Sequence, residues 1–136
     1  MRVVVDTNVL VSGLLSPHGA SAEVIRLIVG GALVPLYDAR ILGEYRELML
    51  DRELEINPDQ VPPLLDAFES NGEVVTALPL KHRLPDPDDE MFLEVAVSGG
   101  AKFLVTFNLK HFPTKSSGVR VVEPKVFLNF WRRSQS

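Results

Sequence analysis

The run Val3-Val4-Val5, which ends on Asp6, constrains the fold of this chain most strongly. Three consecutive β-branched residues with no polar residue between them predict a short strand that is buried on both faces. Such strands are typical of parallel sheets covered by helices, and ligands in open α/β sheets bind beyond the carboxyl ends of the strands. Asp6 is therefore placed either to bind a ligand at that edge or to cap the turn that follows.

Two apolar patterns alternate along the rest of the chain. Apolar residues spaced one helical turn apart predict helices, and short continuous apolar runs predict strands. Helices are expected at residues 22–29, 39–50, 57–71, 90–98 and 124–131, and strands at 3–5, 33–37, 73–78, 102–108 and 119–122. This alternation predicts an α/β fold with a parallel sheet covered on both faces.

Prolines and small residues refine these predictions. Ser12-Gly13 and the segment 16–19 predict a loop after the first strand. Pro35 has no backbone N–H to donate, which favours an edge position for its strand. The pair Pro62-Pro63 is expected to interrupt its helix, because proline inside a helix removes a backbone hydrogen bond. Residues 132–136 are expected to fray.

Length and composition favour one globular domain that covers residues 1–136, since 46% of the residues are apolar and 24% are charged. The chain has no cysteine, which excludes disulfides and thiolate metal sites and suits a reducing, cytoplasmic setting. Asp6 interrupts the first apolar run, so we expect no signal peptide. No apolar segment approaches the ~20 residues that span a bilayer, so we expect no membrane partner.

The net charge of −4 counts against a simple nucleic-acid-binding module, because such modules usually carry a basic surface. It does not count against a nuclease, whose carboxylates are offset locally by metal ions.

Three acids are expected to meet at one edge of the sheet: Asp6, Glu44 at the border of the apolar stripe of its helix, and Asp89 at the start of another. Carboxylates that converge raise one another's pKa, and a hard divalent cation such as Mg²⁺ usually resolves this repulsion. Thr106 and Asn108 end the fourth predicted strand at the same edge, where they are placed to orient water or a carboxylate.

Each acid also has a simpler interpretation. Glu44 on a surface helix is typical of a solvated charge, and Asp89 is equally typical of a helix cap. Asp86 and Asp88, next to prolines, are interpreted as loop acids or caps. The histidines lack the spacing of metal ligands and are interpreted as surface or loop residues; they are His18, His82 and His111.

Four blocks of sequence, spread over nearly the whole chain, form one pattern. They are Val3 to Leu10, Glu44 in the second helix, Pro85 to Ala96, and Phe103 to Asn108. In this order the blocks resemble the PIN-domain family, and more narrowly the VapC-like toxin ribonucleases of toxin–antitoxin pairs.

This resemblance implies a five-stranded parallel sheet in a three-layer α/β/α sandwich. It implies a Mg²⁺- or Mn²⁺-dependent phosphodiesterase that cleaves single-stranded RNA, frequent homodimers and inhibition by an antitoxin protein. The family's catalytic metal ligands map onto Asp6, Glu44 and Asp89, its supporting hydroxyl onto Thr106, and its small polar residue onto Asn8.

One position departs from the family. Many PIN domains carry a fourth acid where this chain has Asn108, whose amide binds metal or water without bringing a charge. A second metal ion should then be held more weakly, and Asp86 or Asp88 are candidates to compensate. The departure keeps open the alternative of a catalytically weak or inactive PIN-fold binding module. An aspartyl phosphatase ranks lower, because its second acid would stand where Asn8 stands.

Five cations flank the loops at the predicted site edge: Lys81, Arg83, Lys102, Lys110 and Lys115. Arg83 and Lys110 are the first candidates to hold the RNA backbone. Each cation is singly also typical of an ordinary solvated side chain.

Overall fold

The valine run forms β1 (Arg2–Val5), the middle strand of a five-stranded sheet. The structure is a computed structural model, and it describes residues 1–113 and 118–135. The strand order is β3-β2-β1-β4-β5, and every neighbouring pair is parallel. The other strands are β2 (Val34–Tyr37), β3 (Glu73–Val74), β4 (Phe103–Val105) and β5 (Arg120–Val122). The predicted parallel sheet is thus confirmed.

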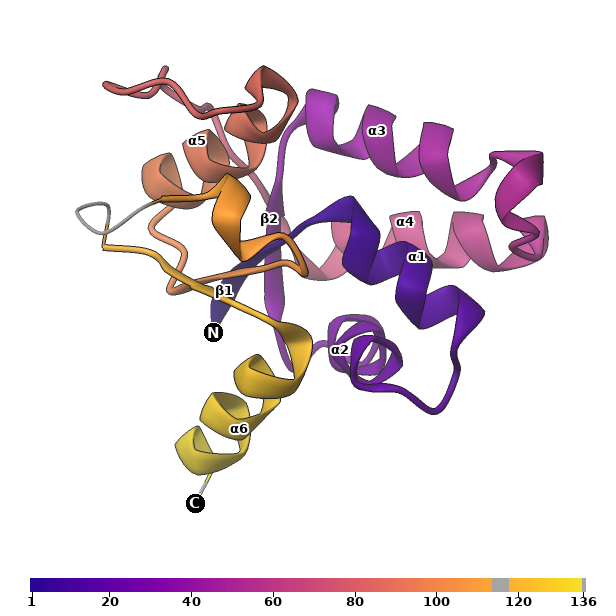
Figure 1. Cartoon of the computed structure of the whole chain (residues 1–136). Coiled ribbons are helices and arrows are strands. Elements are labelled where there is room, and N and C mark those ends of the chain that lie inside the picture. The colour runs from indigo at the N-terminus through magenta and orange to yellow at the C-terminus, as the bar shows by residue number, and fades with distance from the viewer. Residues whose placement is uncertain (114–117, 136) are drawn as a thin grey trace.

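Helices cover both faces of this sheet, which gives three layers (Figure 1). They are α1 (Thr7–Leu15), α2 (Ala20–Val29), α3 (Ala39–Met49), α4 (Val61–Asn71), α5 (Glu90–Ser98) and α6 (Pro124–Ser134). Leu36 packs against the end of α5 at Gly99, whereas the next residue, Tyr37, packs its ring on Phe68 of α4 at 6.4 Å between centroids. Because successive strand residues point to opposite faces, α4 and α5 lie on opposite sides of the sheet.

The predicted loop after β1 is wrong over its first half, because α1 continues to Leu15. Gly13, which suggested a turn, is buried in that helix against α2. A Cβ on Gly13 would lie 3.0 Å from the backbone of Ser21, so the missing side chain lets the two helices approach. Here glycine serves close packing rather than a turn.

The predicted edge position of Pro35 is also wrong, since β2 lies between β1 and β3. The Val34 N–H donates to the Met1 carbonyl on the β1 side, so the nitrogen of Pro35 faces the β3 side. Pairing with β3 begins only at Leu36, opposite Glu73, so no ladder hydrogen bond is lost at Pro35. The third strand ends at Val74 and is therefore shorter than the predicted range 73–78.

The helix ends show two further differences from the predictions. Pro62 and Pro63 lie in the first turn of α4 and do not interrupt it, because N–H groups there need no partner within the helix. The expected fraying from residue 132 is not found as far as Ser134, which ends α6. Arg132 forms an ion pair with Glu23 of α2 at 2.9 Å. Ser136 lies outside the described residues. In the part of the chain that the structure describes, no helix has the length and apolarity to cross a bilayer.

Candidate active site

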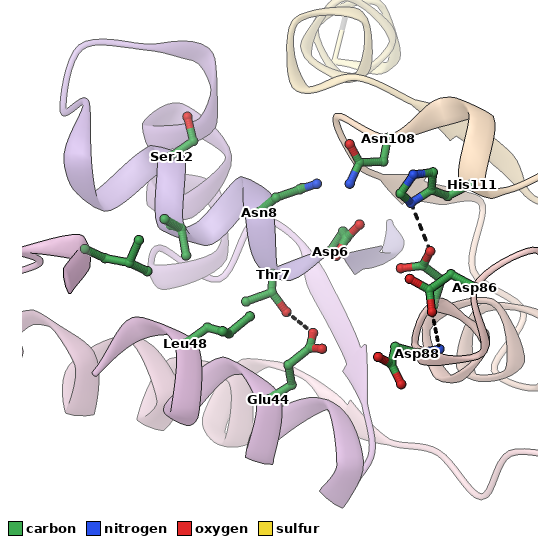
Figure 2. Close-up of a pocket in the computed structure, with 13 residues that line it drawn as sticks. Asp6, Thr7, Asn8, Ser12, Glu44, Leu48, Asp86, Asp88, Asn108 and His111 are labelled. Carbon is green, nitrogen blue, oxygen red and sulfur yellow. Dashed lines mark hydrogen bonds and ion pairs between the residues drawn. The ribbon is translucent and has the colours of Figure 1, made fainter. Parts of the chain in front are cut away.

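An open cleft of about 500 Å³ lies beyond the carboxyl ends of β1 and β4 (Figure 2). Its lining residues are Asp6, Thr7, Asn8, Val11, Ser12, Glu44, Leu48, Leu54, Asp86, Asp88, Asp89, Asn108 and His111. The structure thus brings the three predicted acids together with both predicted asparagines. Thr106 lies directly behind them and is fully buried.

Asp6 follows β1 directly and is only 5% exposed. It occupies the N-cap position of α1, yet its side chain makes no capping hydrogen bond. Instead Asp6 Oδ2 accepts a hydrogen bond from Thr106 Oγ1 at 2.8 Å. Burial raises the pKa of Asp6, the Thr106 hydrogen bond opposes the rise, and the charge of Asp89 adds to it. Asp6 is therefore the N-cap residue of α1 by position, but its carboxylate does not cap the helix and faces the cleft instead.

Glu44 is turned into the cleft by two contacts between α3 and the end of β1. The buried Tyr45 hydroxyl donates to the Val5 carbonyl and fixes α3 against the strand. Thr7 Oγ1, at the start of α1, donates to Glu44 Oε2. Burial raises the pKa of Glu44, and the charges of Asp6 and Asp88 raise it further, against the Thr7 hydrogen bond. Glu44 is therefore not an ordinary solvated charge.

Asp89 closes the 3₁₀ turn at Pro87–Asp89 and holds the N-cap position of α5, again without a capping hydrogen bond from its side chain. The capping in this turn is done by Asp86, whose Oδ1 accepts from the Asp88 N–H at 2.9 Å. Burial raises the pKa of Asp89, and the charge of Asp86 adds to the rise. Asp86 therefore caps this turn, which is one of the two interpretations given for it. The side chain of Asp89 does not act as a cap.

His111 and Thr7 are cleft residues with side-chain contacts to the acids that the sequence interpretation missed. His111 is the titratable one. It ends the 3₁₀ turn Leu109–His111 after β4, and its Nδ1 lies 3.0 Å from Asp89 Oδ2. The histidines were judged by whether their spacing in the sequence suits metal ligands, and this criterion does not detect His111. Its place on the loop that leaves β4, at the same sheet edge as Asp6, was the available signal.

The donor chemistry of the cleft fits a hard divalent cation, because its acids offer oxygen ligands and raise one another's pKa. Within residues 1–113 and 118–135, no three Asp, Glu or His side chains lie close enough together to hold a metal ion between them. Mg²⁺ does not need such a cage, since it is usually bound through one or two carboxylates and keeps several waters. Asp6 with Asp89 or Glu44 would meet this requirement.

The predicted RNA-binding cations lie outside the lining of this cleft. Arg83 is 76% exposed, and its Nε donates to Glu90 Oε2 at 2.9 Å. Lys110 is exposed beside His111. Lys102 was expected at the site edge, but it precedes β4 and so lies at the opposite edge of the sheet, its Nζ 6.0 Å from the centre of the Phe103 ring. Lys81 is exposed on the connection after β3, and Lys115 lies outside the described residues.

Comparison with known proteins decides the family. Residues 2–110 match the PIN domain. The chain belongs to the PIN-domain family. This PIN domain is 27% identical to an uncharacterized protein of Methanocaldococcus jannaschii, over 94% of this chain and 90% of that protein. Its fold is similar to a chain in the crystal structure of VapBC2 from Rickettsia felis, which was solved bound to a DNA fragment from the promoter. The TM-score is 0.55 and the sequence identity is 18%, over 89% of this chain and 97% of that chain.

Family membership carries a functional statement at a coarse level. PIN domains are generally nucleases that use divalent metal ions, so the match supports a hydrolase for this chain. The cleft is consistent with that class, because its acids gather at the sheet edge where α/β proteins bind their ligands.

Proposed function

We propose that this PIN domain is a Mg²⁺- or Mn²⁺-dependent endoribonuclease that hydrolyses phosphodiester bonds of single-stranded RNA. The observation that carries the proposal is the state of Asp6. Its carboxylate is buried, caps no helix, and lies among further acids, with no lysine or arginine among the described residues of the cleft lining. A buried carboxylate among other acids lowers the stability of the fold, and a bound cation would remove this cost.

In this proposal Asp6 binds the metal directly, and Asp89 and Glu44 complete the acidic cluster directly or through water. Thr106 holds one oxygen of Asp6 by its hydrogen bond and so leaves the other oxygen for the cation. Thr7 does the same for Glu44, and His111 orients Asp89. A bound Mg²⁺ or Mn²⁺ would supply an acidified water and offset the charge that develops on the phosphate.

A catalytically weak binding module is the second candidate, and Asn108 favours it. Asn108 lines the cleft at the position where the family's fourth acid is expected, and it brings no charge. Asp86 and Asp88 also line the cleft and bring negative charge to it, on the side away from Asn8 (Figure 2). We infer that these two acids compensate in part for Asn108, which supports the enzyme over the binding module.

The proposal extends to the partners of the chain. The resemblance to VapC-like toxins supports an antitoxin protein and a homodimer, and the absence of cysteine suits a cytoplasmic setting. Native mass spectrometry of the purified chain, alone and with the product of any small neighbouring open reading frame, tests both partners. A monomer that binds no such product would contradict this extension and leave the nuclease proposal intact.

The nuclease proposal is tested by incubating an RNA with single-stranded loops with the wild-type chain in Mg²⁺, Mn²⁺ or EDTA. Asp6→Asn is run beside it, because this change keeps the acceptor for Thr106 and removes the charge. Asp66→Asn is the matched control, since Asp66 is exposed on α4 and lies outside the cleft lining. We expect cleavage in either metal and none in EDTA, a fall of at least about 100-fold in Asp6→Asn, and unchanged cleavage in Asp66→Asn.

Equal cleavage by the wild type and Asp6→Asn would overturn the proposal, as would the absence of cleavage under every metal. The variant Asn108→Asp separates the two candidates, since it restores the missing charge. Cleavage that appears only in Asn108→Asp would identify the natural chain as the binding module.

A further inference from the structure

The two sides of the cleft differ in charge. Glu44, Asp86 and Asp88 lie on one side (Figure 2). On the other side, the amides of Asn8 and Asn108 point toward one another and carry no charge (Figure 2). Asp6 lies between the two sides (Figure 2), so a divalent cation held by Asp6 with the other acids leaves the uncharged amides of the neutral side for another part of the substrate.

Phe107 adjoins this neutral side. It follows Thr106, which is fully buried, and precedes Asn108, yet its own side chain is 44% exposed. Its N–H points to Asn8 Oδ1 at 3.5 Å. Every other phenylalanine, tyrosine and tryptophan in residues 1–113 and 118–135 is buried or half-buried, so Phe107 alone is exposed among these three residue types. The backbone of this exposed residue therefore lies next to Asn8 and Asn108, which line the cleft.

We propose that Phe107 is a stacking platform for an unpaired base of the RNA, with Asn8 and Asn108 contacting the same nucleotide. The inference rests on the proposed function and names the part of the substrate that the neutral side binds. Stacking on an aromatic ring accepts any base and requires that the base be free of a duplex. Phe107 thereby supplies the preference for single strands.

The charge of the cleft favours such a contact. RNA-binding grooves usually hold the phosphate backbone with lysine and arginine, and the described lining of this cleft contains neither. The acids of the cleft repel phosphates unless a cation is bound. An uncharged contact from Phe107 adds affinity without opposing the cation.

Binding is measured on the Asp6→Asn background, which blocks cleavage, by fluorescence anisotropy of a labelled unpaired oligoribonucleotide in Mg²⁺. Phe107→Ala and Phe107→Leu remove the aromatic face, and Phe107→Tyr keeps it. Leu109→Ala is the matched control, because Leu109 is an apolar side chain of the same loop with a similar exposed fraction, 42%. Melting curves of all variants verify the fold, which an exposed side chain should not disturb.

We expect Phe107→Ala and Phe107→Leu to weaken binding about 5- to 150-fold, the range for one stacked base. Phe107→Tyr and Leu109→Ala should stay within about twofold of the parent. In the cleaving background, Phe107→Ala should raise KM by a similar factor and change kcat little. A fully paired duplex should bind equally weakly to all variants.

Three results would overturn the inference: Phe107→Ala that binds as tightly as the parent, Phe107→Leu that binds as tightly as Phe107→Tyr, or no RNA binding by the parent. Because the binding assay uses a protein that does not cleave, its outcome is independent of turnover. Absence of cleavage by the wild type with stacking-dependent binding would contradict the nuclease proposal and support the role of Phe107.

Discussion

The two ends of β1 treat charge in opposite ways. At the amino end, Arg2 pairs with Glu73 at 2.7 Å and donates from Nε to the Gly99 carbonyl at 3.0 Å. At the carboxyl end, Asp6 is buried beside Thr106, which donates a hydrogen bond to it, and burial together with the charge of Asp89 raises its pKa. The same sheet therefore neutralises charge at one edge and accumulates like charge at the other.

This difference separates the parts of the molecule that serve stability from those that serve function. An exposed ion pair contributes up to about 1 kcal/mol, so the amino edge is mildly stabilised. Buried like charges cost free energy, and natural folds keep such costs mainly where function needs them. Replacing an acid by its amide at each edge tests the comparison. The change should raise the free energy of unfolding at the carboxyl edge and lower it at the amino edge.

The larger effect is expected at the carboxyl edge. Asp6→Asn should raise the free energy of unfolding by about 1 kcal/mol at pH 7 without metal, and Tm by about 3–5 °C. The pKa of Asp6 is raised in the fold, so the folded state binds its proton more tightly than the unfolded state does. The charged form therefore costs stability above the folded pKa, and this cost declines as the pH falls below the folded pKa and is gone below the unfolded pKa.

The stability gained in Asp6→Asn, measured as the free energy of unfolding, should accordingly be largest at neutral pH and vanish in acid. Thermal melts in EDTA between pH 7.5 and pH 4 measure it, with Asp66→Asn as the control for the loss of a charge. A destabilised Asp6→Asn at pH 7 would show that the carboxylate serves the fold, contrary to this account.

The smaller effect is expected at the amino edge. Glu73→Gln removes the charge that pairs with Arg2 and keeps the Arg2 hydrogen bond to Gly99. Both side chains are about half exposed, so we expect a loss of about 0.5 kcal/mol at low salt, which shrinks in 0.5 M NaCl. If Glu73→Gln instead increased the free energy of unfolding, the two edges would not differ in the way this account states.

The strands and the three acids were predictable because regular elements fix them. Apolar runs located all five strands, and parallel strands then brought Asp6 and the end of β4 to one edge. Glu44 followed from its place on the border of a helical stripe. The resemblance to PIN domains agreed with the predicted strands and with the three acids. The match of residues 2–110 to the PIN domain confirms the family.

The errors arose where one residue type serves two purposes. Gly13 indicated a turn but permits close packing of α1 on α2, and Pro35 indicated an edge but lies where a ladder hydrogen bond is not required. His111 and the capping role of Asp86 depend on the path of irregular loops. Periodicity does not encode such paths, so contacts within the loops required the structure.

Titration of Mn²⁺ into the metal-free wild type and Asp6→Asn, followed by calorimetry at pH 7 and pH 5, tests most directly whether the acidic edge is built for a cation. We expect the wild type to bind Mn²⁺ more tightly at pH 7 than at pH 5, because protons compete for carboxylates with raised pKa values. Asp6→Asn should bind about tenfold or more weakly at pH 7. Equal affinity of the two proteins, or no binding to the wild type, would contradict the account.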